Sequence, residues 1–96
     1  MKSLISEMDT LWIFNGPGAQ FPSGAFTSRE KAEERIQQHR LSGALTAYPI
    51  DIGVYDWAIA TGHFVPKRDD QRGPEFIQRF SSASQEHYHY ENGRTS

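Results

Sequence analysis

The pattern of hydrophobic positions predicts two strands at the start of the chain. Residues 11–14 (LWIF) are apolar, aromatic or β-branched, which is typical of a short and mostly buried strand. Residues 15–18 (NGPG) must then turn, because two glycines tolerate a positive φ and the proline fixes its own. Residues 20–27 (QFPSGAFT) return as an irregular strand, with Pro22 at an edge or bulge where a missing N–H is harmless.

The next segment predicts the main helix, over about residues 28–41. Thr27 and Glu30 have the spacing of a capping box, and Ser28 is a competing N-cap one residue later. Strong helix formers follow, and Gly43 is well placed as the terminator. The apolar positions of this segment are Ala32, Ile36 and Leu41. So narrow a stripe predicts a helix that covers one face of a sheet and leaves the rest of its surface in water.

Beyond this helix the pattern predicts a strand and a shorter helix. Residues 45–50 (LTAYPI) are expected to form a strand, with side chains that alternate between its two faces. Asp51 can cap a second helix over about residues 53–61, which Gly62 ends. Because apolar side chains lie on most sides of this helix, we expect it to be largely buried.

The last third of the chain predicts a loop and a hairpin. Residues 65–74 (VPKRDDQRGP) contain two prolines, a glycine and five charges, which is typical of a solvated loop. Residues 75–80 (EFIQRF) resume strand character, and residues 86–91 (EHYHYE) are the expected hairpin partner. An Asn92-Gly93 turn signal follows.

Length and composition favour one domain. The chain has 96 residues, of which 36% are hydrophobic and 23% charged, as in an ordinary globular protein with one modest core. We therefore predict a single α+β domain over residues 1–96, with residues 1–9 and 93–96 frayed. Its sheet is mostly antiparallel with four or five strands, and the element order is β-β-α-β-α-β-β.

Cysteine usage and charge narrow the class of protein. The chain has no cysteine, which excludes disulfides, thiolate metal sites and cysteine nucleophiles. Residues 1–9 (MKSLISEMD) lack the apolar core of a signal peptide, and no apolar run approaches a membrane span, so a bacterial-type cytoplasmic protein is the interpretation. The net charge is −2, and acidic and basic residues alternate on the main helix, which disfavours a nucleic-acid partner.

The histidine-tyrosine repeat at residues 87–90 (HYHY) is the sharpest chemical feature. On a strand, both histidines share one face and both tyrosines share the other. His87 and His89 could therefore present two imidazoles to a divalent metal such as zinc, in a metal-binding protein or a small metal-dependent hydrolase. A third ligand would come from His63, Glu86 or Glu91. The simpler interpretation is a half-exposed strand with tyrosines packed inward and histidines outward, and a partner-binding role for the histidines is a third.

Evidence for catalysis is weak. Asp51, Asp56 and His63 could gather as two carboxylates and a base, the minimum for acid–base chemistry. No serine sits in a GxSxG elbow, and neither an HExxH nor a Walker-type motif exists. The GPG sequence at 16–18 is no phosphate cradle, because proline removes a donor that such a loop needs. The protein is therefore more simply interpreted as a non-enzyme.

A cluster of aromatic and acidic residues predicts a binding surface instead. The candidate residues are Tyr48, Asp51, Tyr55, Asp56 and Trp57. No lysine or arginine lies between Leu41 and Pro66, so rings left exposed there would form an acidic and aromatic patch. Such a patch suits a basic protein surface, with the rings as anchors and the aspartates paired with cations of the partner.

Three blocks of the sequence carry a family resemblance. They are WIFNGPGAQFPSGAF, HRLSGALTAYPIDIGVYDWA and FSSASQEHYHYENG. With these blocks the chain resembles, over about residues 11–93, a family of small single-domain bacterial proteins of unknown function. The resemblance implies no functional residues, but its members look like small proteins encoded among bacterial toxin–immunity genes. The leading hypothesis is thus a non-catalytic protein-binding domain, such as an immunity-type inhibitor of a basic toxin domain; the alternatives are the metal site and a homodimer formed through an edge strand or the aromatic tail.

Overall fold

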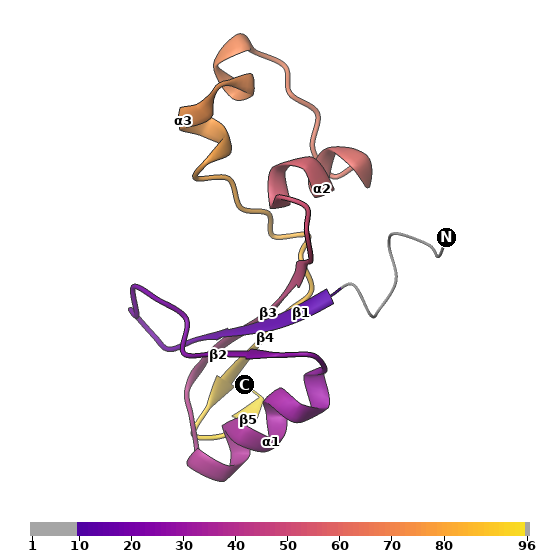
Figure 1. Cartoon of the computed structure of the whole chain (residues 1–96). Helices are drawn as coiled ribbons and strands as arrows, with labels where there is room; N and C mark the ends of the chain where they lie inside the picture. The colour runs from indigo at the N-terminus through magenta and orange to yellow at the C-terminus, as the bar shows by residue number, and fades with distance from the viewer. Residues whose placement is uncertain (1–9, 96) are drawn as a thin grey trace, which may run out of the picture. The chain divides into compact units, whose positions relative to one another are not determined.

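Within residues 10–95, five strands form one antiparallel sheet in the order β2-β1-β3-β4-β5 (Figure 1). The computed structural model describes residues 10–95. The strands are β1 (Thr10–Asn15), β2 (Gly24–Phe26), β3 (Gly43–Pro49), β4 (His87–Glu91) and β5 (Arg94–Thr95). The helices are α1 (Arg29–His39), α2 (Val54–Ala60), the 3-10 helix η2 (Asp69–Arg72) and α3 (Pro74–Ile77). The predicted α+β class and its antiparallel sheet are confirmed.

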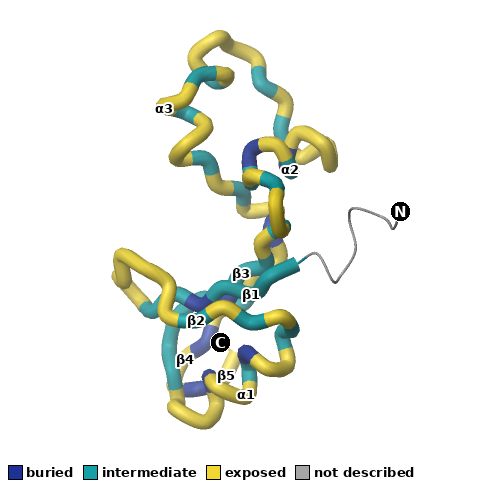
Figure 2. The backbone as a smooth tube through the Cα atoms, in the orientation of Figure 1, coloured by how far each residue is buried: buried dark blue, intermediate teal, exposed yellow. Residues whose placement is uncertain are grey.

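The chain divides into two compact units. The sheet unit contains the described residues up to Ile50 and those from Gln85 onward, and the helical unit spans Asp51–Ser84. Figure 2 shows most buried positions of the sheet unit on its strands and on α1, whereas most of the helical unit is exposed or half-buried. The prediction of a single domain concerns the folding of both units together and stays a prediction.

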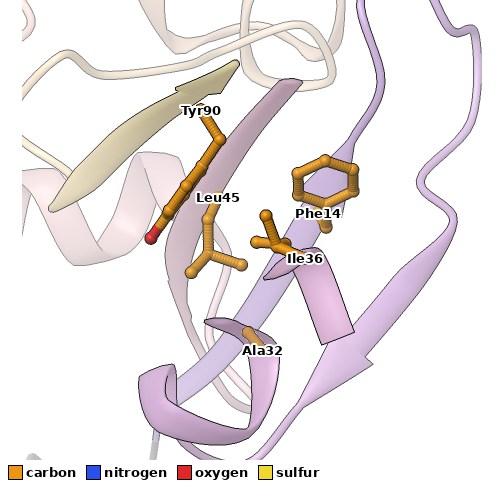
Figure 3. Close-up of a cluster of buried hydrophobic side chains, with 5 residues drawn as sticks. All are labelled: Phe14, Ala32, Ile36, Leu45 and Tyr90. Carbon is orange, nitrogen blue, oxygen red and sulfur yellow. The ribbon is translucent and has the colours of Figure 1, made fainter. Parts of the chain in front are cut away.

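The core of the sheet unit lies between α1 and one face of the sheet. Strand register places Phe14 opposite Leu45 and Leu45 opposite Tyr88, so their side chains share that face. Ile36 projects from α1 toward the buried side chains of the sheet (Figure 3), and it is 1% exposed. The five buried residues of this core are Phe14, Ala32, Ile36, Leu45 and Tyr90. Full burial of an aliphatic side chain of this size stabilises the fold by about 2 kcal/mol.

The ends of α1 show which of the predicted caps is used. Ser28 is the N-cap, and its hydroxyl accepts a hydrogen bond from the Lys31 N–H at 3.1 Å. At the other end Arg40, not Gly43, adopts the left-handed conformation, with φ 54°. The Leu41 N–H donates to Ile36 O at 2.9 Å, which completes a Schellman turn. The helix therefore ends at His39, two residues before its predicted end.

Gly43 has a different role, at the start of β3. Its φ is 149°, and a Cβ there would lie 2.1 Å from Asn15 O and 2.8 Å from Phe14 Cζ. Such distances are far below van der Waals contact, so β1 approaches β3 closely at this point because Gly43 has no side chain.

The turn signal at Asn92-Gly93 joins β4 to β5. Both residues have positive φ, 53° and 86°, as a two-residue type I′ hairpin turn requires. The Gly93 N–H donates to Leu41 O at 2.8 Å, and the Asn92 N–H donates to Ser42 Oγ at 3.0 Å. These hydrogen bonds tie the turn and β5 to the end of α1. The expectation that residues 93–96 fray stays a prediction, and residues 1–9 and 96 lie outside the described residues.

The helical unit is organised around aromatic rings. Tyr55 of α2 lies within 5.4–6.2 Å, centroid to centroid, of Phe64, Phe76 and Phe80. Its hydroxyl donates to the Gln71 carbonyl at 2.7 Å, which ties α2 to η2. The ring cluster consists of Tyr55, Phe64, Phe76 and Phe80, and it packs the short helices of this unit together.

Two expectations for this unit are wrong. Residues 75–80 do not form a strand, because Pro74 starts α3 and the i, i+4 spacing of Phe76 and Phe80 places both rings against Tyr55. Consequently β4 pairs with β3 and β5 instead of with residues 75–80. Asp51 does not cap α2: it has a left-handed φ of 68°, and Gly53 is the N-cap.

The second helix is also less buried than its apolar composition suggested. Within α2 the buried side chains are Tyr55 and Ala58, and Ile59 is 40% exposed.

In the part of the chain that the structure describes, no helix has both the length and the apolar character that a membrane crossing requires.

Candidate functional site

One side of α2 faces solvent and carries both an acidic and several apolar side chains. Tyr55 and Ala58 are the buried side chains of α2. With about 3.6 residues per turn, Asp56 and Ala60 lie opposite them, and Trp57 and Ile59 lie on the two flanks. Asp56 and Ala60 are exposed, Ile59 is 40% exposed and Trp57 is half-buried. We call these four residues, Asp56, Trp57, Ile59 and Ala60, the α2 surface.

Trp57 is fixed in place by its neighbours. The His63 ring stacks on the indole with 5.4 Å between the ring centroids and 21° between their planes. Thr61 Oγ1 donates to Trp57 O at 2.8 Å and lies 2.8 Å from His63 Nδ1. The threonine hydroxyl therefore bridges the Trp57 carbonyl and the His63 ring. The indole is therefore pre-organised at the surface, which lowers the entropy cost of using it in binding.

The other predicted binding residues fall into different places. Tyr55 is 7% exposed at the centre of the ring cluster, so it stabilises the helical unit and does not present a surface to a partner. Tyr48 belongs to β3 of the sheet unit, where it is 36% exposed. Asp51 is exposed at the start of the helical unit. Of the five predicted residues, Asp56 and Trp57 share one surface element.

The acid–base constellation proposed from the sequence is not joined by any contact. Among the described residues, no hydrogen bond or ion pair connects Asp51, Asp56 and His63. His63 instead contacts Thr61 and Trp57, as described above.

The two histidines of β4 lie as the alternation predicted. His87 and His89 are exposed, whereas Tyr90 is buried and Tyr88 half-buried on the opposite face. The ring centroids of His87 and His89 are 5.4 Å apart at an interplanar angle of 88°. Within residues 10–95, however, no three His, Cys, Asp or Glu side chains gather as a metal-binding group, so the structure does not add His63, Glu86 or Glu91 to the pair.

A groove between α1 and the β4–β5 hairpin is the feature that sequence reasoning missed. It has a volume of about 1340 Å³, and its lining includes Arg29, Glu33, Arg40 and Arg94. Arg29 Nε donates to Glu33 Oε2 at 3.1 Å. The guanidinium of Arg29 also lies 3.6 Å from the centre of the Tyr88 ring. The i, i+4 spacing of Arg29 and Glu33 suggested an ordinary solvated pair, and only the pairing of β3 with β4 brings the tyrosines against it.

Tyr90 makes a second hydrogen bond to the carboxylate of Glu33. Its hydroxyl donates to Glu33 Oε2 at 2.5 Å. Burial, together with this hydrogen bond to a carboxylate, raises the pKa of Tyr90 to about 12, because both disfavour the phenolate. The tyrosine therefore remains a neutral donor at any physiological pH.

Comparison with known proteins places the chain in a family but assigns no activity. The profile of a family described as a domain of unknown function (DUF7710) matches residues 11–96, and the chain belongs to that family. This confirms the resemblance to a family of unknown function drawn from the three sequence blocks. No curated protein and no solved structure matches the chain.

Proposed function

We propose that this DUF7710 domain is a non-catalytic domain that binds another protein. The observation that carries the proposal is the α2 surface, where an exposed carboxylate, an exposed isoleucine and a pre-organised tryptophan lie on one short helix. Exposed apolar side chains beside a half-buried tryptophan are typical of the centre of an interface. The geometry of the Asp51, Asp56 and His63 side chains favours binding over catalysis, because no contact joins them.

The charges around α2 indicate the chemistry of the partner. Residues 51–66 contain Asp51 and Asp56 and neither lysine nor arginine. A complementary partner therefore offers apolar contacts to Trp57 and to Ile59 on the two flanks of the helix, together with lysine or arginine side chains that pair with the aspartates. Opposite charges of this kind raise the rate of association and select against acidic partners.

An immunity-type inhibitor of a bacterial toxin domain is the specific role that we favour. A toxin domain that acts on nucleic acid presents lysines and arginines to phosphates, and an acidic helix with apolar anchors is complementary to such a surface. Small immunity-type proteins were also the expectation drawn from the sequence blocks. This role accounts for the acidic α2 surface without requiring a catalytic group or a bound cofactor.

Native mass spectrometry of the protein purified gently from its own host tests the proposal. A stoichiometric complex with a second protein is the expected result, and the mass of two identical chains would instead indicate a homodimer. Once the partner is identified, Trp57→Ala and Asp56→Lys should each weaken binding by at least about 2 kcal/mol, since they remove an anchor and reverse a charge at the centre of the surface.

A matched control separates this surface from general charge effects. Glu34 is exposed on α1 and belongs to the sheet unit, so Glu34→Lys makes the same charge reversal on a residue that is not part of the α2 surface and should leave binding unchanged. Tyr55→Ala is unsuitable as a test, because it removes the central ring of the cluster. If Trp57→Ala and Asp56→Lys both bind normally with unchanged circular dichroism, the assigned surface is wrong.

A further inference from the structure

We propose that His87 and His89 form a two-histidine binding site for a divalent transition metal such as Zn²⁺. The site lies on the sheet unit, and it is independent of the partner surface proposed for α2. It needs neither His63 nor a nearby carboxylate, and in this respect it differs from the three-ligand site considered from the sequence.

The sheet register leaves open space around both imidazoles. His87 lies opposite Thr46 and His89 lies opposite Ala44, so the cross-strand neighbours are small. The bulky tyrosines of β4 point to the other face, against the core beneath α1. Both histidines are exposed, and a metal ion can therefore reach them from solvent.

The separation of the two rings fits a shared ion. Zinc binds an imidazole nitrogen at about 2.0–2.1 Å and prefers tetrahedral angles, which places the centroids of two bound rings roughly 5 Å apart. The observed separation of His87 and His89 is 5.4 Å. The observed separation is therefore close to that of two imidazoles on one ion.

His87 is already in the form that binds a metal. Its Nδ1 lies 2.7 Å from the Gln85 carbonyl oxygen, which can only accept a hydrogen bond. Nδ1 therefore carries a proton and donates a hydrogen bond to that carbonyl, and in the neutral ring the lone pair lies on Nε2. Metal-binding histidines usually donate their second ring nitrogen to a carbonyl or carboxylate in this way, which fixes the ring and increases its basicity.

The carbonyl that orients His87 is itself held by the sheet. Gln85 is 5% exposed, and its side-chain Nε2 donates to Ala47 O at 3.1 Å. The Ala47 N–H donates to Glu86 O at 2.9 Å, which continues the β3–β4 ladder past the first residue of β4. The orientation of His87 is thus supported by the backbone of two strands.

Beside His89 there is room for the remaining ligands of the metal. A depression of about 580 Å³ is lined by His89 together with Asn15 and Glu91. Since no third metal-binding side chain joins the pair among the described residues, water completes the coordination shell. A site with two protein ligands and open positions exchanges its metal readily, so we expect moderate affinity and no requirement of the metal for folding.

Isothermal titration of the tag-free chain with Zn²⁺ tests the proposal, with variants of all four histidines. One Zn²⁺ should bind per chain, and His87→Gln and His89→Gln should each lower the affinity at least about tenfold. His39→Gln and His63→Gln are the matched controls, one in each unit, and should leave binding unchanged. Absence of binding to the unaltered chain, or equal effects of all four substitutions, would overturn the proposal.

Nuclear magnetic resonance of the imidazole nitrogens supplies a second readout that does not depend on affinity. In the free protein His87 should be protonated at Nδ1, and Zn²⁺ should shift its Nε2 resonance. The resonances of His39 and His63 should stay in place. Detection of the Nε2–H form of His87, or a Zn²⁺ shift confined to the two control histidines, would contradict the assignment.

Discussion

The sheet unit and the helical unit bury aromatic rings in different ways. In the sheet unit, Phe14 and Tyr90 pack with aliphatic side chains between α1 and a face defined by strand register. In the helical unit, Tyr55 is surrounded by three phenylalanines at the ends of short helices and in loops. The first core depends on regular alternation, whereas the second depends on contacts between rings that follow no strand or long helix.

The two ways of burying rings leave different side chains exposed for binding in each unit. The register of the sheet places the core side chains on one face and leaves His87 and His89 exposed on the other. The ring cluster of the helical unit buries few side chains besides Tyr55 and Ala58. Three large apolar side chains of this unit are exposed: Ile59 at 40%, Val65 at 63% and Ile77 at 38%.

The largest expected loss of stability comes from a substitution at Gly43, where β1 and β3 approach closely in the sheet unit. Gly43→Ala would place a Cβ 2.1 Å from Asn15 O at a positive φ, so β1 and β3 must separate. We expect the free energy of unfolding to fall by about 4 kcal/mol, the sum of overpacking and backbone strain. Chemical denaturation measures this loss.

A glycine in the turn after β1 controls for the effect of φ alone. Gly18 also has a positive φ, 68°, but no atom lies within 4 Å of the position that an added methyl group would take. Gly18→Ala should therefore cost about 1 kcal/mol, from the left-handed conformation only. Equal losses of stability for Gly18→Ala and Gly43→Ala would show that the close contact of residue 43 with Asn15 O adds nothing to the cost of the substitution.

The two buried tyrosines allow a direct comparison of the units. The Tyr90 hydroxyl donates to a carboxylate, and the Tyr55 hydroxyl donates to a neutral carbonyl. Hydrogen bonds to charged groups contribute more, so Tyr90→Phe should cost about 2 kcal/mol and Tyr55→Phe about 1 kcal/mol. Denaturation of both variants gives the comparison, and the reverse order would contradict it.

The pH dependence of stability also distinguishes Tyr90 from Tyr55. The pKa of Tyr90 is raised from 10.0 to about 12 in the folded protein, chiefly by burial, so the folded state keeps a proton that the unfolded state has lost. The stability from this group is complete below pH 10 and is lost as the pH rises toward 12. In Tyr90→Phe the free energy of unfolding should no longer show the decrease that comes from ionisation of this tyrosine. Tyr55→Phe leaves Tyr90 in place and should still show that decrease.

The smallest expected effect concerns the exposed apolar residues of the helical unit. Ile59→Ala removes a side chain that is 40% exposed and lies outside the ring cluster. The free energy of unfolding should change by less than about 1 kcal/mol, whereas Ile36→Ala in the sheet unit should lower it by about 3 kcal/mol. A similar loss for both would mean that Ile59 belongs to a core and not to a binding surface.

Local sequence patterns determined the elements that one period can describe. The narrow stripe of Ala32 and Ile36 predicted the buried side of α1, and both residues are essentially inaccessible. The alternation in HYHY placed tyrosines inward and histidines outward, as the structure shows. These predictions succeed because the repeat of a helix or strand assigns every side chain to a face without reference to the rest of the chain.

Tertiary structure alone decided the features that depend on distant partners. The EFIQRF segment is apolar enough for a strand, but contacts of Phe76 and Phe80 with Tyr55 favour a helical turn. The same contacts make Tyr55 a core residue and leave Trp57 at the surface, which no local period distinguishes. Arg29 and Glu33 meet the tyrosines of β4 only after β3 pairs with β4. Each of these outcomes is a contact between residues far apart in sequence, and composition or spacing along the chain carries no information about which distant side chain will be the neighbour.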